Sequence, residues 1–272
     1  MKTIKNMILH NLKSPHKIPI KIVRKIIFLY KKANYNFKAF ELEQNKRFVK
    51  SKLDRVEGIK KLKKIKENYK FLEREMSSEH EVLFSSISIS PKIKINNILE
   101  IGTFDAVNAF LLSKLFQDSK IETIDLKSDE IDFTSTYKRN KNVEKFINLR
   151  DSLVSKIENI KFIELNSVKL IFSQKKYDLI WIDGAHGYPV CCIDIINSVK
   201  LLNKNGIIMV DDILIENNEN DKMYDSIAGF ETLKELEKNN IIKLDFFYKR
   251  LDADSNADTK KISYVALARL LN

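Results

Sequence analysis

Residues 97–125 constrain the fold of this 272-residue chain most strongly. An apolar run that ends in residues 100–102, Glu-Ile-Gly, indicates a strand that turns sharply at its last residue. Apolar residues then recur at helical spacing as far as Leu115, and residues 121–124 supply a second apolar run. An apolar run, apolar residues at helical spacing and a second apolar run, in this order, are typical of a strand, a helix and a second strand parallel to the first.

Two residues of this unit have the chemistry of a ligand site. A glycine at position 102 lets a ligand approach the backbone where the helix N-terminus offers unpaired N–H groups. Asp125 ends the second strand, where a carboxylate can accept hydrogen bonds from both hydroxyls of a ribose. Phe104 and Val107 stand where a dinucleotide fingerprint would have its second and third glycines. We therefore expect an adenosyl ligand without a pyrophosphate, and neither NAD nor FAD.

In this stretch the chain resembles the class I S-adenosylmethionine-dependent methyltransferases, whose first motif is E/D-x-G-x-x-x-G. Ala106 replaces the last glycine of that motif. The resemblance implies S-adenosylmethionine as the cofactor and a set of residues that contact it. These residues are Glu100, Gly102, Thr103, Phe104, Asp105, Asp125, Leu126, Asn166, Ser167 and Asp183.

A second pattern, WIDGAHGYPVCCIDI, is followed after a predicted helix by GIIMVDD. Two buried strands therefore end in acids, the first at Asp183 and the second at Asp211 and Asp212. Ligands of such sheets bind at the carboxyl ends of the strands. We expect these acids and His186 to converge on one rim near Gly102.

This second pattern resembles the branch of those methyltransferases that modifies sugars and small hydroxylated metabolites, over about residues 77–270. The resemblance implies a divalent cation held by Asp183, Asp211 and Asp212, and three carboxylates suit Mg²⁺ or Mn²⁺. A different interpretation of the last two acids, as caps of the following helix or loop, stays open.

The catalytic residues expected from this resemblance are His186 and Asp183. Relatives often carry a catalytic acid where this chain has Ala185. His186 is the substitute, because a neutral imidazole can take the acceptor's hydroxyl proton. The alternative, that His186 is only a hydrogen-bonded turn residue, also stays open.

The alternation of strands and helices predicts an α/β fold with a doubly wound, seven-stranded Rossmann-like methyltransferase sheet and an antiparallel last strand. We divide the chain into a basic helical extension, residues 1–76, and a class I methyltransferase domain, residues 77–272. Ser78 and Glu81 are predicted to form a capping box at the start of a short helix. His80 in that helix is either a surface histidine or a residue that borders the cofactor cleft.

The net charge of +11 is concentrated in the extension, where 22 Lys and Arg stand against 7 Asp and Glu in residues 1–76. Residues 18–32 predict an amphipathic helix with a basic face. Such a helix packs on its own domain, on a second subunit of a homo-oligomer or on an anionic membrane surface. We expect its role to be association rather than cofactor binding.

The leading hypothesis is an S-adenosylmethionine-dependent O-methyltransferase acting on a sugar, glycan precursor or other small hydroxylated metabolite, with Mg²⁺ assisting. The alternatives are a nucleic-acid-binding or RNA-modifying methyltransferase that uses the basic extension, and a cofactor-binding scaffold without catalysis. The sequence lacks the Asn/Asp-Pro-Pro-Tyr motif of enzymes that methylate base amines, and it lacks the aromatic-basic interleaving typical of base stacking. Both absences count against the nucleic-acid alternative.

We expect a cytoplasmic protein, associated with the inner membrane surface if residues 18–32 bind lipid. Cys191 and Cys192 are adjacent and poorly placed to bridge each other. The chain has no apolar run of about 20 residues, and its first residues do not resemble a signal peptide.

Overall fold

The computed structural model describes residues 18–73, 78–135, 143–216, 226–256 and 262–271. Its strands are β1 (Asn97–Ile101), β2 (Lys120–Asp125), β3 (Ile160–Glu164), β4 (Tyr177–Ile182), β5 (Leu202–Leu214), β6 (Ile242–Tyr248) and β7 (Ser263–Leu270). Its α-helices are α2 (Ile18–Ala33), α3 (Phe37–Lys50), α4 (Arg55–Asn68), α5 (Glu79–Ser88), α6 (Val107–Leu115), α7 (Ile131–Ser135), α8 (Val143–Val154), α9 (Val190–Leu201), α10 (Ala228–Lys238) and α11 (Ala253–Asn256). Two 3-10 helices are η2 (Lys70–Leu72) and η4 (Ser167–Phe172).

The seven strands form one sheet in the order β3-β2-β1-β4-β5-β7-β6. The first five of these are parallel, and β7 runs antiparallel to both of its neighbours. The predicted doubly wound sheet with its antiparallel last strand is therefore confirmed. Because β1 lies between β2 and β4, the strand order reverses at β1, and parallel sheets bind ligands at the carboxyl edge of such a reversal.

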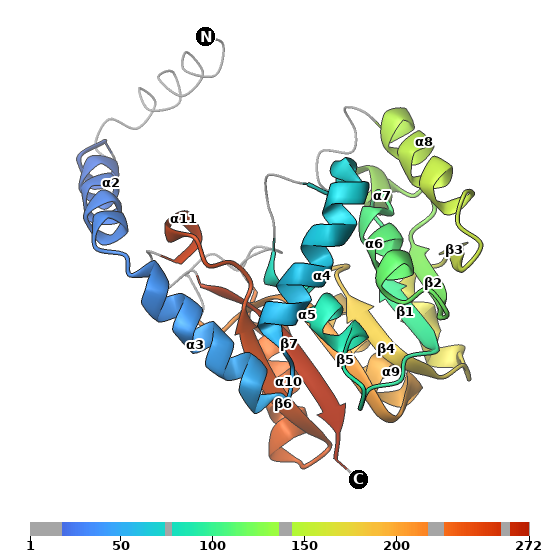
Figure 1. Ribbon diagram of the computed structural model, residues 1–272. Helices are drawn as coiled ribbons and strands as arrows, with labels where there is room; N and C mark the ends of the chain where they lie inside the picture. Colours follow the sequence, from blue (N-terminus) through green and yellow to red (C-terminus); the bar gives the residue numbers. More distant parts are fainter. Residues whose placement is uncertain (1–17, 74–77, 136–142, 217–225, 257–261, 272) are drawn as a thin grey trace.

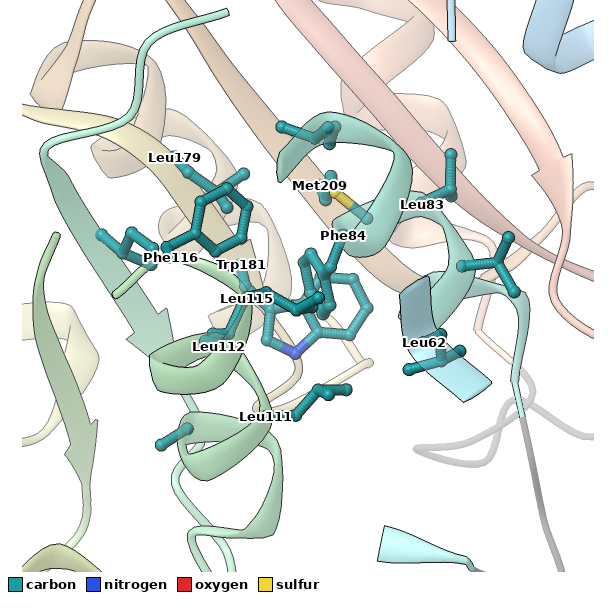
Figure 2. Packing of buried hydrophobic residues seen from close by; sticks show 14 of the residues in the cluster. Leu62, Leu83, Phe84, Leu111, Leu112, Leu115, Phe116, Leu179, Trp181 and Met209 are labelled. Carbon is teal, nitrogen blue, oxygen red and sulfur yellow. The ribbon is translucent and has the colours of Figure 1, made fainter. Parts of the chain in front are cut away.

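Two hydrophobic layers cover the sheet because side chains alternate between its faces along each strand. On one face α4, α5 and α6 pack over Trp181 and its neighbours, which Figure 2 shows from close by. This cluster includes Leu62, Leu83, Phe84, Leu111, Leu112, Leu115, Phe116, Leu179, Trp181 and Met209. On the other face α9 and α10 pack over Ile180, Ile182 and Val210 (Figure 1).

The N-terminal helices belong to the same hydrophobic core as the sheet. Phe48 on α3, Leu53, Leu62 on α4 and Leu72 in η2 are all buried in the cluster that contains strand residues. The predicted boundary between residues 76 and 77 touches residues 74–77, which lie outside the described part. The two-domain division stays a prediction, but residues from α3 to η2 share their core with the sheet.

Helix α2 confirms the helix predicted over residues 18–32, and it lies beyond α3 at one end of the molecule (Figure 1). It leaves Ile26, Ile27, Leu29 and Tyr30 largely exposed. What covers this face, a second subunit or a membrane surface, stays a prediction. Within the described ranges, none of the helices has the length and apolar character required to cross a bilayer.

The predicted capping box at the start of α5 is wrong, although the helix begins where expected. Ser78 makes no side-chain cap hydrogen bond, and its hydroxyl donates instead to the carbonyl of Lys249 at 3.2 Å. The Glu81 carboxylate accepts a hydrogen bond from Lys66 Nζ at 2.6 Å. Partners from distant parts of the chain therefore outcompete the local capping pattern.

Candidate active site

The turn after β1 can be made only by a residue without a side chain. Gly102 has φ +100°, and a Cβ at this position would lie 2.2 Å from the carbonyl oxygen of Asp183. The Gly102 N–H donates to the carbonyl of Ile124 at 2.9 Å, and the Asp183 N–H donates to that of Ile101 at 2.9 Å. The turn is therefore held between the ends of β2 and β4, packed closely against the backbone of Asp183.

Asp125 lies beside this turn, as predicted. Its Oδ2 accepts a hydrogen bond from the Phe104 N–H at 2.9 Å, and its Oδ1 accepts one from the Leu126 N–H at 2.8 Å. Each carboxylate oxygen has a second lone pair, and the side chain is only partly buried. Asp105 accepts from the Val107 N–H at 3.2 Å and so helps to begin α6.

Glu100 and Thr103 are in the predicted cofactor set, but their side chains point into the protein. Glu100 is fully buried, and it accepts hydrogen bonds from Asn108 Nδ2 at 2.7 Å and Thr123 Oγ1 at 2.5 Å. Thr103 Oγ1 lies 2.6 Å from Thr123 Oγ1. Burial raises the pKa of Glu100 to about 7. These buried side chains stabilise the turn from inside the protein. A cofactor at the turn could therefore contact Glu100 and Thr103 only through their backbone atoms.

Asn166 and Ser167 follow β3, on the same edge of the sheet as Asp125. The Leu165 N–H donates to the carbonyl of Asp125 at 2.8 Å, which fixes this loop beside β2. Asn166 Oδ1 accepts from the Val168 N–H at 3.1 Å and caps η4. Both residues are partly exposed, and the structure places them in the loop beside Asp125.

The two acids of β5 reach one place because the strand is irregular there. Neighbouring residues of a regular strand point to opposite faces. The pairing of β5 with β7 shifts register between Val210 and Ile213, and Asp212 has φ +50°. Such irregularities re-aim side chains beside active sites. Asp211 and Asp212 both contact Lys249 as a result.

Lys249 is the residue that the sequence analysis missed. Its Nζ lies 2.6 Å from Asp211 Oδ2 and 2.6 Å from Asp212 Oδ1, and its side chain is only 7% exposed. Burial alone would lower the pKa of Lys249, but the two carboxylates outweigh burial and raise it. Burial likewise would raise the pKa of Asp211, and the neighbouring ammonium instead holds it below its usual value. The sequence signal for this role is weak: Lys249 directly follows the aromatic residues that end β6.

His186 lies between two of the predicted acids. It is 7% exposed, and its Nε2 lies 3.7 Å from Asp183 Oδ1 and 3.8 Å from Asp212 Oδ2. Burial, reinforced by the charge of Asp211, raises the pKa of Asp183 well above its ordinary value. The structure thus brings the four predicted rim residues together, with an ammonium among them.

The predicted Mg²⁺ site does not fit this arrangement. Two of its three expected ligands, Asp211 and Asp212, already share the ammonium of Lys249. In the part of the chain that the structure describes, no group of three or more His, Cys, Asp or Glu side chains could hold a metal ion. A cation of the protein itself, the Lys249 ammonium, therefore already lies between two of the expected ligands.

His80 borders the rim and is not the surface histidine of the first interpretation. Its ring lies 4.9 Å from that of Trp181 between centroids, and its Nδ1 lies 2.9 Å from Ser78 Oγ. Burial lowers the pKa of His80, against the opposing charge of Asp211. The ring is therefore neutral near pH 7 and lines the side of the rim nearest α5.

A family model described as a methyltransferase domain matches residues 99–213. This span runs from β1 to β5 and contains all the rim acids, His186 and Asp125. The search of curated proteins returned no match. The match confirms the predicted methyltransferase domain over this span.

Several solved structures, methyltransferases among them, are similar in fold. Cofactor-bound Rv0187 from MTB is 14% identical, with a TM-score of 0.50 over 70% of this chain and 76% of that one. The O-methyltransferase from Bacillus cereus in complex with SAH is 14% identical, with a TM-score of 0.46 over 65% and 74%. The N-methyltransferase NodS from Bradyrhizobium japonicum WM9 is 15% identical, with a TM-score of 0.47 over 71% and 96%.

Proposed function

We propose that this methyltransferase moves the methyl group of S-adenosylmethionine to a hydroxyl oxygen of a small acceptor, a sugar or another hydroxylated metabolite. The observation that carries the proposal is the position of His186 between Asp183 and Asp212, beside the turn at Gly102. When bound, S-adenosylmethionine supplies a methyl group activated on a sulfonium. The residues of this chain must then align the acceptor and accept its proton.

The donor side of the site suits an adenosyl group. Gly102 lets the end of β1 approach the Asp183 backbone closely and so shapes the turn beside Asp125, and the partly exposed carboxylate of Asp125 can accept hydrogen bonds from ribose hydroxyls. Asn166 and Ser167 lie on the far side of Asp125 and would border the adenine. No residue in this set offers a cradle for a pyrophosphate.

The acceptor side needs a base, and His186 fits that role. Its imidazole can take the hydroxyl proton as the oxygen attacks the methyl group, a contribution of roughly 10²- to 10⁴-fold in rate. The imidazolium that forms would lie within 4 Å of carboxylate oxygens of Asp183 and Asp212.

The charge of the rim favours an uncharged hydroxylated acceptor over nucleic acid. Asp183, Asp211 and Asp212 gather there, and Lys249 is buried among them. Proteins that bind nucleic acid need exposed Lys and Arg against the phosphates, whereas the partly exposed charged side chains of this rim group are the acids Asp183 and Asp212, at 35% and 28% exposure. Carboxylates are natural hydrogen-bond acceptors for the hydroxyls of a sugar.

The test is methyl transfer by the full chain from labelled S-adenosylmethionine to a panel of sugars and small hydroxylated metabolites. His186→Ala should lower the rate at least 100-fold, with donor affinity unchanged within about twofold. Ile196→Ala, on the exposed face of α9, is the control and should behave as the wild type. A His186→Ala variant with the wild-type rate would contradict the proposal.

A further inference from the structure

We propose that Lys249 is the resident cation of the active site: its ammonium positions Asp211 and Asp212 in place of a divalent metal, and methyl transfer is therefore metal-independent. The statement about transfer rests on the proposed function. The statement about the cation concerns only the charges of this chain, so it can be tested without an acceptor.

The ammonium of Lys249 lies between the two acids of β5. Nζ of Lys249 is equally distant, at 2.6 Å, from one oxygen of Asp211 and one of Asp212. Contacts this short are typical of charge-assisted hydrogen bonds, which are stronger than neutral ones. An ammonium has three N–H donors, and these contacts use two of them. Lys249 thus draws together two acids that would otherwise repel each other.

A divalent metal and the ammonium of Lys249 exclude each other at this rim. A divalent ion bound by Asp211 and Asp212 would have to share their oxygens with a positive charge that already lies 2.6 Å away. Repulsion between cations at such a distance is large wherever solvent is excluded, and the Lys249 side chain is only 7% exposed. The site can hold the lysine or the metal, but not both.

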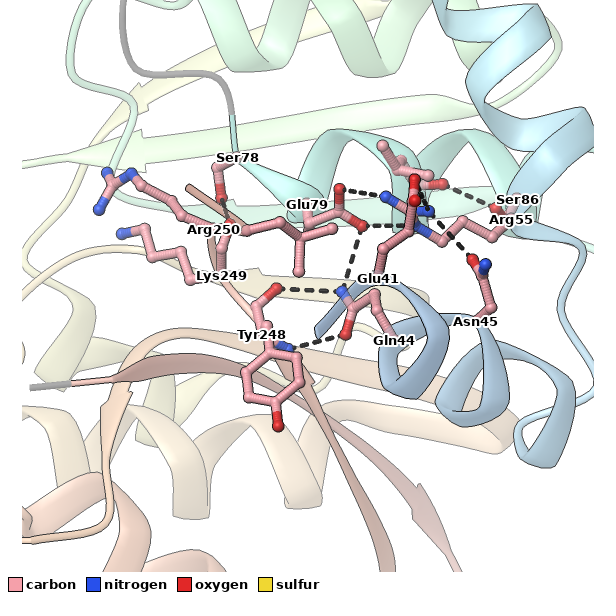
Figure 3. A network of polar contacts seen from close by, with 12 residues as sticks. Glu41, Gln44, Asn45, Arg55, Ser78, Glu79, Ser86, Tyr248, Lys249 and Arg250 are labelled. Atoms are coloured by element: carbon pink, nitrogen blue, oxygen red, sulfur yellow. Dashed lines mark hydrogen bonds and ion pairs between the residues drawn. The ribbon is translucent and has the colours of Figure 1, made fainter. Parts of the chain in front are cut away.

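The backbone around Lys249 is fixed by contacts with α3 and with the start of α5. Its carbonyl accepts hydrogen bonds from the Glu79 N–H at 2.8 Å and from Ser78 Oγ at 3.2 Å. Gln44 of α3 pairs with both backbone groups of Tyr248, at 3.1 Å and 3.0 Å. Figure 3 shows this network, with the side chain of Lys249 extending away from it. The backbone that carries the Lys249 side chain is therefore fixed relative to α3 and α5.

The decisive experiment is a titration of the full chain with Mn²⁺, followed by electron paramagnetic resonance. The wild type should bind no Mn²⁺ at this rim. Lys249→Met should leave three carboxylates without their cation, and Mn²⁺ affinity should rise at least tenfold. Lys243→Met removes an exposed lysine near the start of β6, the strand that Lys249 directly follows, and should behave as the wild type. Adding Asp211→Asn to Lys249→Met should abolish the gain.

Each outcome has a definite meaning. Wild-type binding of Mn²⁺ that Asp211→Asn removes would overturn the proposal, and this result needs no lysine variant to fold. A folded Lys249→Met variant without a gain in Mn²⁺ affinity would overturn it as well. A merely structural lysine would lower stability when replaced but would create no metal site.

Activity gives a second readout. Wild-type methyl transfer should be unchanged in excess chelator, and Lys249→Met should lose rate and recover part of it with Mn²⁺. Loss of wild-type activity in chelator, restored by Mg²⁺, would overturn the proposal. Absence of any methyl transfer would count against the proposed function alone, because the Mn²⁺ titration does not depend on it.

Discussion

Arg55 on α4 and Glu79 on α5 form a two-pronged ion pair, with Nε and Nη2 of the guanidinium each 2.8 Å from a carboxylate oxygen. The two side chains are only 8% and 12% exposed. Gln44 donates to the same carboxylate at 3.1 Å and connects the pair to the end of β6 (Figure 3). The helices that precede the sheet are thus joined to the last residue of β6, directly before Lys249.

Removal of one partner should leave a buried charge without its counter-ion. Glu79→Ala should lower the free energy of unfolding by about 3 kcal/mol, measured by urea denaturation. Glu57→Ala is the matched control, because Glu57 pairs with Lys60 on the exposed side of α4 at 53% and 66% exposure. That exposed pair should contribute little to stability, because solvent screens it. Equal effects of the two substitutions would contradict the described network.

Helix α3 should contribute to global stability through a single buried ring. Phe48 is fully buried, and its ring lies 5.0 Å from that of Phe247 on β6. Phe48→Ala should therefore lower the free energy of unfolding by about 3–5 kcal/mol. The adjacent Val49 is 73% exposed, so Val49→Ala should change it by less than about 0.5 kcal/mol. A negligible effect of Phe48→Ala would mean that the N-terminal helices fold apart from the sheet.

The buried carboxyl of Glu100 should make stability depend on pH. Its pKa is raised from 4.5 to about 7 in the folded chain, so the folded state holds this proton more tightly than the unfolded state. The contribution of Glu100 to stability is therefore largest below pH 4.5 and is lost as the pH rises towards 7. The full loss is on the order of 3 kcal/mol.

Glu100→Gln should remove that dependence, because a neutral amide cannot titrate. Its oxygen can still accept from Asn108, and its NH₂ can donate to Thr123. Urea denaturation at pH 5 and pH 8 should show the wild type losing stability relative to the variant. Parallel stabilities of the two proteins at both pH values would contradict the assignment.

The sequence predicts the central sheet well because its signals are local. The apolar runs of β1 and β2, the helical spacing of α6 and the glycine at position 102 lie within 30 residues, and parallel strands bring Asp183 and Asp211 to the same edge. Each of these features follows from periodicity or from the end of a strand.

Lys249 and the role of the N-terminal helices could not be predicted in the same way. Lys249 reaches Asp211 and Asp212 because β7 lies between β5 and β6 and because β5 is irregular at its acids. Periodicity shows that Phe48 lies on an apolar helix face, but it does not name β6 as the partner. Contacts of this kind, such as that of Gln44 with Tyr248, join positions 204 residues apart in the sequence. Local sequence patterns therefore cannot predict them.

The most direct test of the account is calorimetric titration of the full chain with S-adenosylmethionine. The wild type should bind, and Asp125→Ala should weaken binding by about ten- to a hundredfold, because a carboxylate facing two hydroxyls contributes roughly 1.5–3 kcal/mol. Asp129→Ala, an exposed acid in the following loop, should bind as the wild type does, and NAD should produce no signal. A wild-type chain that does not bind S-adenosylmethionine, or a folded Asp125→Ala variant with undiminished affinity, would contradict the central claim.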